Sequence, residues 1–96
     1  MATGEDAPRY RIEFTHPARK ELADLPRKAR ERIAPRIDAL SVNPRPHGVE
    51  KLKGEDDLYR IRVGDYRVIY TIQDARLIVM VVRVAYRRDA YRRRGN

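Results

Sequence analysis

Two strand-like segments joined by only two residues are the strongest structural signal in this 96-residue chain. In residues 59–63 and 66–73, apolar and polar side chains largely alternate, and Gly64 and Asp65 stand between the two segments. A period of two is typical of strands with one buried face, and a short Gly-Asp connection favours a tight turn. The sequence therefore predicts an antiparallel β-hairpin, and every fold without a sheet is excluded.

Apolar spacing predicts the remaining elements. Residues 9–14 alternate like a strand, and residues 77–85 form a strand that is apolar on both faces, so we expect it to be central and covered on each side. Thr15-His16-Pro17 predicts a helix start, Pro26 separates two helices, and Pro35 is expected to kink the second helix without ending it. Both helices carry one apolar stripe, formed by Ala18, Leu22 and Leu25 and then by Ala29, Ile33, Ile37 and Leu40.

The element order β-α-α-β-β-β predicts an α+β fold. We expect a four-stranded, mostly antiparallel sheet with a helical hairpin packed on one face. A chain of 96 residues is too short for two independent cores, so residues 9–96 are expected to form a single domain after a flexible N-terminus at residues 1–8.

Composition excludes several classes of function. The chain has no Cys, which removes disulfides and thiolate chemistry, and its two His are too far apart for a metal motif, so we expect no metal and no cofactor. Residues 77–82 form the longest apolar run, too short to span a bilayer, and residues 1–8 do not resemble a signal peptide. We therefore expect a cytoplasmic protein with no membrane partner.

The net charge of +8 is concentrated in the C-terminal part of the chain. Residues 1–57 contain 12 basic and 11 acidic residues, whereas residues 58–96 contain 10 arginines and 3 acidic residues. Such a concentration favours a polyanionic partner, with nucleic acid preferred over a membrane. A solubility tail or a docking site for an acidic protein are the alternatives.

The register of the predicted hairpin brings three arginines together. With a two-residue loop, Arg62 faces Arg67, and both share with Arg60 the sheet face opposite to the helices. Like charges directly opposite each other destabilise a strand pair, so stability alone would not select this arrangement. We interpret the cluster as a cradle for a phosphodiester. In the alternative, two of the side chains extend into water and one pairs with Asp65 or Asp89.

Two tyrosines and two arginines follow the last strand. Tyr86, Arg87, Arg88 and Tyr91 are expected to emerge beside the start of the neighbouring strand, close to the arginine cluster. A tyrosine ring can stack on a base, and its hydroxyl can transfer a proton. Each tyrosine could equally be a packing residue.

Three runs of sequence together resemble the RelE branch of the RelE/ParE toxin superfamily. They are KLKG at residues 51–54, LYRIRVGDYRVIY at 58–70 and VAYRRDAYR at 84–92, within a resemblance that spans about residues 9–92. The resemblance implies a RelE-like fold, similar to microbial ribonucleases, and a type II toxin that cuts mRNA in the A site of the 30S ribosomal subunit. It also implies neutralisation by a RelB-like antitoxin encoded beside it, with DNA contacted only through the antitoxin complex.

The resemblance further implies the site residues. The candidate catalytic residues are Arg60, Arg62, Arg67, Arg87 and Tyr91, and the resemblance also implies RNA contacts for Lys51 and Lys53. Tyr86 and Arg88 complete the candidate RNA-binding residues because of their position after the last strand. RNA can be cleaved without a metal when its 2′-hydroxyl attacks the adjacent phosphorus, so the protein needs to orient the RNA, stabilise charge and transfer protons. Arg67 and Arg87 would stabilise the pentavalent phosphate, and Arg60 and Arg62 would hold the flanking phosphates.

The residues that transfer protons in this reaction are left open. Arginine is a poor general base, and Tyr86 stands where many relatives have His as the acid or base. This leaves Tyr86 and Tyr91 as the candidates within the chain, with Tyr91 also a candidate for orienting the 2′-hydroxyl, and the ribosome supplying part of the site is the alternative. Two other functions are compatible with the scaffold: a ParE-like toxin that inhibits DNA gyrase, and a non-catalytic RNA-binding module. The combination of the arginine cluster with Tyr91 favours the ribonuclease.

Overall fold

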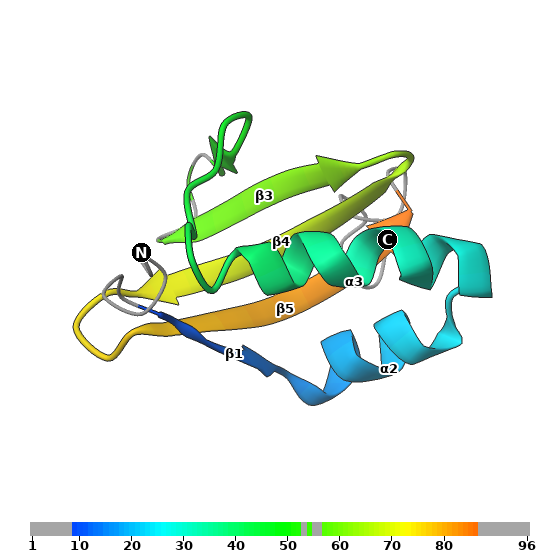
Figure 1. Cartoon of the computed structure of the whole chain (residues 1–96), viewed down its shortest axis with the longest axis horizontal. Helices are drawn as coiled ribbons and strands as arrows, with labels where there is room; N and C mark the ends of the chain where they lie inside the picture. The colour runs from blue at the N-terminus through cyan, green and yellow to red at the C-terminus, as the bar shows by residue number, and fades with distance from the viewer. Residues whose placement is uncertain (1–8, 53, 55–56, 87–96) are drawn as a thin grey trace, which may run out of the picture.

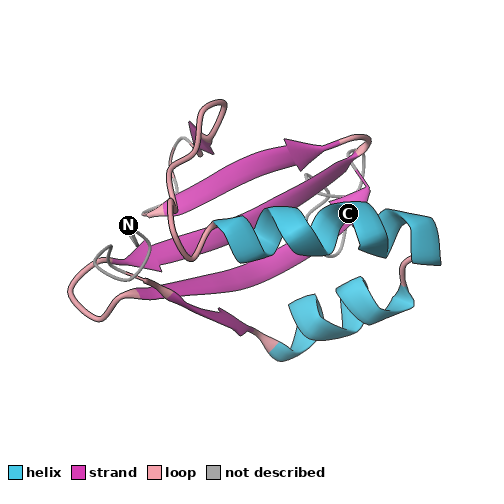
Figure 2. Cartoon of the chain, in the orientation of Figure 1, coloured by secondary structure: helices cyan, strands magenta, loops and turns pink. Residues whose placement is uncertain are grey.

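The computed structural model describes residues 9–52, 54 and 57–86. Their strands form one five-stranded sheet in the order β1-β5-β4-β3-β2, in which β1 pairs in parallel with β5 and the other neighbouring pairs are antiparallel. Both helices lie on the same face of this sheet (Figures 1 and 2). The elements are β1 (Arg11–Phe14), α2 (His16–Asp24), α3 (Arg27–Ala39), β2 (Glu50–Lys51), β3 (Leu58–Val63), β4 (Tyr66–Gln73) and β5 (Ile78–Tyr86).

The α+β class and the helical hairpin on one sheet face are confirmed, but the predicted number of four strands is wrong. The fifth strand is β2, two exposed residues that pair with β3 through Glu50–Arg60 and Lys51–Tyr59. Two residues are too few to show an alternating pattern, so this strand has no signal in the sequence. The expectation of a flexible N-terminus at residues 1–8 lies outside the described residues.

Strand β5 is interior, but β4 is the middle strand and the helices do not cover both faces. On the face away from the helices, β5 contributes instead to a small apolar cluster around the buried residues Ile69 and Ala85. Leu52, Leu58 and Val82 pack against this pair. The apolar character of both faces of β5 therefore reflects one large core and one small one.

Local signals in the sequence explain how the two helices begin and continue. At the start of α2 the backbone N–H of Ala18 donates to Thr15 Oγ1 at 3.2 Å, and Pro17 occupies the first turn, where its missing N–H has no cost. Helix α3 continues through Pro35 without a break (Figure 1). Pro35 is on the exposed side of α3, so the carbonyl that it leaves without a donor can be solvated.

The main core lies between α3 and the sheet. Ile33, Ile37 and Leu40, all at most 1% exposed, form the buried stripe of α3. They pack in one cluster with the helix-facing side chains of the three long strands, which include Ile61, Val63, Val68, Tyr70, Val79, Val81 and Val84. This packing determines which face of β3 and β4 is buried against the helices. Arg60, Arg62 and Arg67 therefore lie on the opposite face.

Polar contacts connect the loop after α3 to the turn between β4 and β5. The Arg45 guanidinium donates to both carboxylate oxygens of Asp74, at 3.2 and 3.0 Å, and the Tyr10 hydroxyl donates to the same carboxylate at 2.6 Å. Buried Tyr70 adds a hydrogen bond from its hydroxyl to the carbonyl of Pro44, at 2.7 Å. These contacts hold the loop over the end of the sheet where Tyr59 and Tyr70 stack.

We expect Asp74→Asn to reduce the acid sensitivity of the fold. The hydrogen bond from Arg45, and after it the one from Tyr10, lowers the pKa of Asp74. A carboxyl with a lowered pKa stabilises the fold above its unfolded pKa, and this contribution is lost as the pH falls through the lower, folded value. Melting temperatures measured below about pH 4 should therefore fall more steeply for the wild type than for Asp74→Asn. Parallel curves, or an equal effect of Asp38→Asn on the exposed side of α3, would contradict this prediction.

Candidate nucleic-acid interface

The hairpin has the register that the sequence predicted. Arg62 pairs with Arg67 and Val63 with Tyr66 across the Gly64-Asp65 turn. Gly64 has a φ of 62°, a conformation that residues with a side chain rarely adopt. The turn therefore fixes which residues of β3 and β4 face each other, and with them the two faces of the hairpin.

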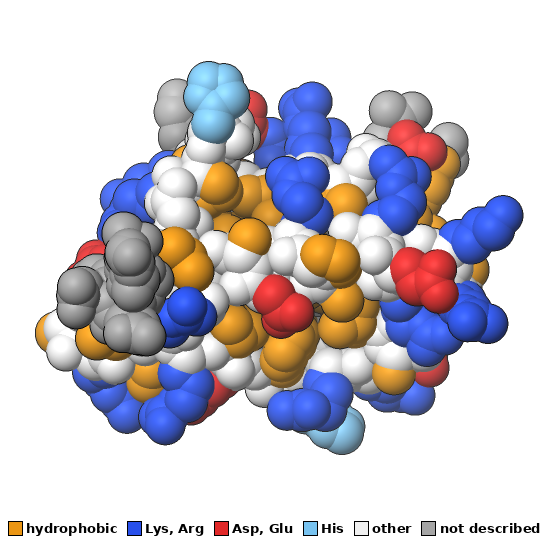
Figure 3. Space-filling model, viewed as in Figure 1, with side chains coloured by type: hydrophobic (Ala, Val, Ile, Leu, Met, Phe, Trp, Pro, Cys, Tyr) orange, Lys and Arg blue, Asp and Glu red, His pale blue; other side chains and the backbone are white. Residues whose placement is uncertain are grey.

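Arg60, Arg62 and Arg67 lie on the sheet face without helices, and we call them the arginine cluster. Their neighbours Ile61, Val63 and Val68 belong to the main core, and side chains alternate between the two faces of a strand. Arg62 is exposed and Arg67 is half-buried. On the helix-covered face, basic side chains are interspersed with acidic and apolar ones (Figure 3). On the opposite face, the three basic side chains of the arginine cluster lie together on two adjacent strands.

Arg60 is the buried member of the cluster, with 7% of the residue exposed. Burial lowers the pKa of Arg60, and the positive charges of Arg67 and Arg62 lower it further. Its Nη2 atom forms an ion pair with Oε1 of Glu50 on β2. The alternative interpretation of the sequence paired one arginine of the cluster with Asp65 or Asp89. In the structure Arg60 pairs with Glu50, which the sequence analysis did not name, because the short strand β2 places Glu50 directly opposite Arg60. Asp89 lies outside the described residues.

Arg60 lies beside a small apolar cluster. On the same sheet face, Ile69 is its partner in β4, and Ile69 packs with Ala85, Leu52, Leu58 and Val82. An apolar environment strengthens electrostatic interactions, both favourable and unfavourable. The small apolar cluster therefore makes the charge of Arg60 more costly to leave uncompensated than a charge in water.

Two predicted RNA-binding residues are on the other side of the sheet. Lys51 pairs with Tyr59, and its Nζ atom lies 5.9 Å from the centre of the Tyr59 ring, on the helix-covered side. Tyr86 pairs with Tyr66, and their rings meet edge to face with centroids 5.6 Å apart. Tyr86 was expected close to the arginine cluster, and Lys51 was expected to contact RNA from the resemblance alone. Strand alternation turns both side chains away from the cluster.

The other four predicted site residues lie outside the described part of the chain. These are Lys53, Arg87, Arg88 and Tyr91. Strand β5 ends at Tyr86, opposite Tyr66, at the end of the sheet where Arg62 and Arg67 lie. The roles of Lys53, Arg87, Arg88 and Tyr91 stay predictions from the sequence and the resemblance.

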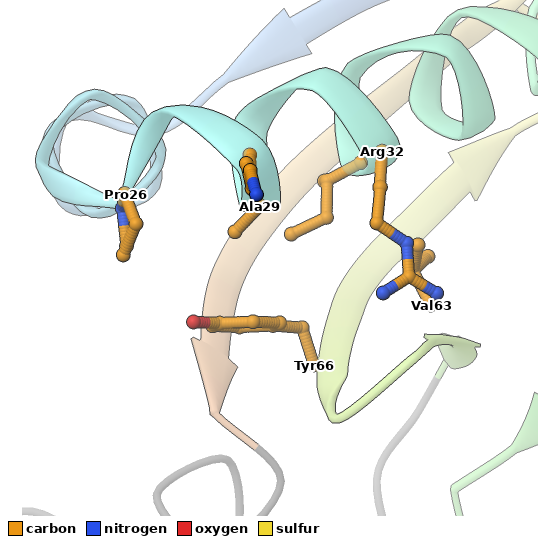
Figure 4. Close-up of a pocket in the computed structure, with 7 residues that line it drawn as sticks. Pro26, Ala29, Arg32, Val63 and Tyr66 are labelled. Carbon is orange, nitrogen blue, oxygen red and sulfur yellow. The ribbon is translucent and has the colours of Figure 1, made fainter.

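A pocket of about 240 Å³ opens on the helix-covered face between α3 and the hairpin (Figure 4). The Tyr66 ring lies under the start of α3, and the Arg32 side chain reaches towards the hairpin beside Val63 (Figure 4). The lining is mainly apolar with two cations, and consists of Pro26, Lys28, Ala29, Arg32, Ile33, Val63 and Tyr66. Such a pocket can accept an apolar side chain from a segment that carries negative charge.

Glu50 is the site residue that the sequence did not reveal. Glu50 directly precedes the KLKG run, but a single acidic residue before two lysines is typical of an ordinary charged surface and gives no signal of a site. Its partner can be inferred only when β2 is known to pair with β3.

Within the described residues, no group of three or more His, Asp or Glu side chains could hold a metal ion, and none of the described helices is long and apolar enough to cross a membrane.

Comparison with known proteins identifies consistent relatives. Residues 12–91 match the family model described as ParE toxin of type II toxin-antitoxin system, parDE. Toxin RelG of Mycobacterium tuberculosis is 32% identical over 88% of this chain and 98% of its own length. The mRNA interferase toxin RelE of Escherichia coli K12 is 30% identical over 81% of this chain and 83% of its own. In the archaeal RelE-RelB complex from Pyrococcus horikoshii, the matching chain is 34% identical, with a TM-score of 0.71 over 81% of this chain and 94% of that one.

Proposed function

Because the chain belongs to the RelE-type branch of the RelE/ParE family of type II toxins, we propose that it is a ribosome-dependent endoribonuclease that cleaves mRNA in the A site. The observation that carries this proposal is the pairing of Arg62 with Arg67 on a helix-free sheet face, next to Arg60. Two guanidiniums that face each other attract the same anion, because each can donate charge-assisted hydrogen bonds to it. An RNA phosphodiester is such an anion.

The proposed reaction uses the RNA's own 2′-hydroxyl as the nucleophile and needs no metal. The 2′-oxygen attacks the adjacent phosphorus, loses its proton to a base, and the 5′-oxygen leaves with a proton from an acid. Arg67, with Arg87, stabilises the additional negative charge of the pentavalent phosphate, and Arg62 holds a neighbouring phosphate. Tyr91 orients the 2′-hydroxyl or transfers the proton. The rigid sheet supports this chemistry, because donors fixed on strands need little reorganisation during the reaction.

Primer extension on a translated mRNA tests the proposal. Expression of the protein should produce cleavage at positions in phase with codons, and the cuts should disappear when ribosomes are kept off the message. The same RNA incubated with the protein alone should stay largely intact. Uncut messages in cells that nonetheless stop growing would refute the ribonuclease assignment.

A gyrase-inhibiting toxin is the second candidate, because the matching family model carries the ParE description. This function works through protein binding and does not require a phosphate cradle. Induction of DNA damage with intact messages would support it, and a protein with the arginine cluster removed would then still be toxic. The paired arginines favour the ribonuclease over this alternative.

We also propose a RelB-like antitoxin as the partner, since the related archaeal toxin was crystallised with RelB. The pocket beside α3 is the surface that we assign to this partner, because Lys28 and Arg32 complement an acidic segment and Tyr66 and Ile33 provide an apolar floor. An apolar side chain of the antitoxin would fill the pocket.

Lys28→Glu should weaken the complex with the product of the adjacent reading frame several-fold, because reversing a rim charge places like charges together. Lys20→Glu on α2 makes the same change of net charge away from the pocket and serves as the control. Affinity measured by calorimetry should fall for the first variant and change little for the second. Equal losses would show that only net charge matters, and failure to co-purify any partner would contradict the antitoxin assignment.

A further inference from the structure

Glu50 places a carboxylate in a cluster that otherwise consists of arginines. It pairs with Arg60 across β2 and β3, and its Oε1 atom contacts Nη2 of Arg60. The Glu50 side chain is 52% exposed, whereas the Arg60 side chain is 8% exposed. Solvent and ligands can therefore reach the anion of this pair more easily than the cation.

The buried cation needs a nearby negative charge. Arg60 lies beside Ile69 of the small apolar cluster, and its burial and the charges of Arg67 and Arg62 all disfavour its charged form. Arginine stays protonated at physiological pH, so the positive charge is compensated instead of removed. In the free protein Glu50 contributes this compensation.

A phosphate oxygen can take over the role of the carboxylate. Both groups carry negative charge and accept charge-assisted hydrogen bonds from a guanidinium with similar geometry. Glu50 lies on a strand of two residues at the edge of the sheet, paired on one side only. Few contacts therefore oppose a rotation of its side chain away from Arg60.

We propose that Glu50 occupies the position of one substrate phosphate and that bound RNA displaces it from Arg60. The proposal rests on the proposed function in taking RNA as the anion. In the free toxin the Glu50 carboxylate offsets part of the repulsion within the arginine cluster. On binding, Arg60 exchanges Glu50 for a phosphate oxygen, so Glu50 lowers the affinity for RNA while it stabilises the free fold.

The central test measures binding of Glu50→Gln to a single-stranded RNA oligonucleotide whose 2′-hydroxyls are all methylated, which prevents cleavage. Fluorescence anisotropy should show affinity increased on the order of tenfold at low salt, because a competing charge close to the phosphate has been removed. The logarithm of affinity should also depend more steeply on salt, by on the order of one unit of slope, because Arg60 now releases a solution anion. Without RNA the variant should melt at a lower temperature than the wild type, and RNA should recover most of the difference.

Two comparisons isolate the Glu50–Arg60 pair. Glu31→Gln removes the same charge from α3, where Glu31 pairs with Arg27 on the opposite side of the sheet, and should change RNA affinity little. In an Arg60→Gln background, Glu50→Gln should no longer increase affinity. If Glu50→Gln fails to fold, Glu50→Asp keeps the charge and shortens the side chain, and it should also bind RNA more tightly than the wild type.

Weaker or unchanged RNA binding by Glu50→Gln would overturn the proposal, since Glu50 would then hold Arg60 in its working position or be irrelevant to it. An equal gain from Glu31→Gln would also overturn it, because only net charge would be responsible. These outcomes are independent of mRNA cleavage. A protein that cuts mRNA but gains no affinity from Glu50→Gln disproves this inference alone, and one that gains affinity but cuts no mRNA disproves the ribonuclease function alone.

Discussion

Arg67→Ala is expected to reduce the rate of ribosome-dependent mRNA cleavage by about 10²- to 10³-fold, the usual cost of removing one fixed donor from a developing negative charge. Arg67 stands in the middle strand of the sheet, opposite Arg62 and beside Ala85 of β5. Its half-buried position on a rigid strand gives its guanidinium a defined direction. Primer extension with purified ribosomes and a defined message measures the effect.

Arg67→Lys separates charge from geometry at the same position. Lysine keeps the positive charge but loses the planar pair of donors that binds two phosphate oxygens, so an intermediate rate is expected. Arg27→Ala, on the exposed surface of α3, removes a charge from the helix-covered side and should leave the rate close to that of the wild type. Full activity of folded Arg67→Ala would rule out its role in catalysis, and circular dichroism establishes that each variant is folded.

Ile37→Ala is expected to lower the free energy of unfolding by about 2–5 kcal/mol, the range for truncating a buried isoleucine. Ile37 is 1% exposed and lies in the middle of the α3 stripe that packs on the sheet. Helix α3 has no side-chain hydrogen bond at its N-cap and contains Pro35, so packing contributes most of its stability. Urea unfolding monitored by circular dichroism measures the change.

Ile37→Val removes a single methylene and should cost about 0.5–1.5 kcal/mol, which provides a graded control. Arg36→Ala, one residue earlier on the exposed side of the helix, should change stability by no more than about 0.5 kcal/mol. Similar losses at positions 36 and 37 would mean that the buried stripe is not what holds α3 in place, because alanine does not lower the helix propensity at either position.

Only part of the candidate site could be predicted from the sequence. The two-residue turn determines that Arg62 faces Arg67, because its length fixes the register of the hairpin. The period of two then places Arg60 on the same face as Arg62. The same alternation turns Lys51 and Tyr86 to the helix-covered side, a result that requires knowing where each strand begins. Burial of Arg60 could not be predicted, because it depends on how its strand lies between Glu50 of β2 and Ile69 of β4 in the folded sheet.

Local patterns in the sequence thus determined the helices, the long strands, the hairpin register and the sheet face that carries the arginines. These features depend on residues close together in the chain: Thr15 as a cap, Gly64 in a turn, and apolar residues at regular spacing. The tertiary structure alone decided that a fifth strand forms and that Glu50 compensates Arg60. The physical reason is that a two-residue strand has almost no intrinsic stability and exists only where the folded sheet offers β3 as its partner.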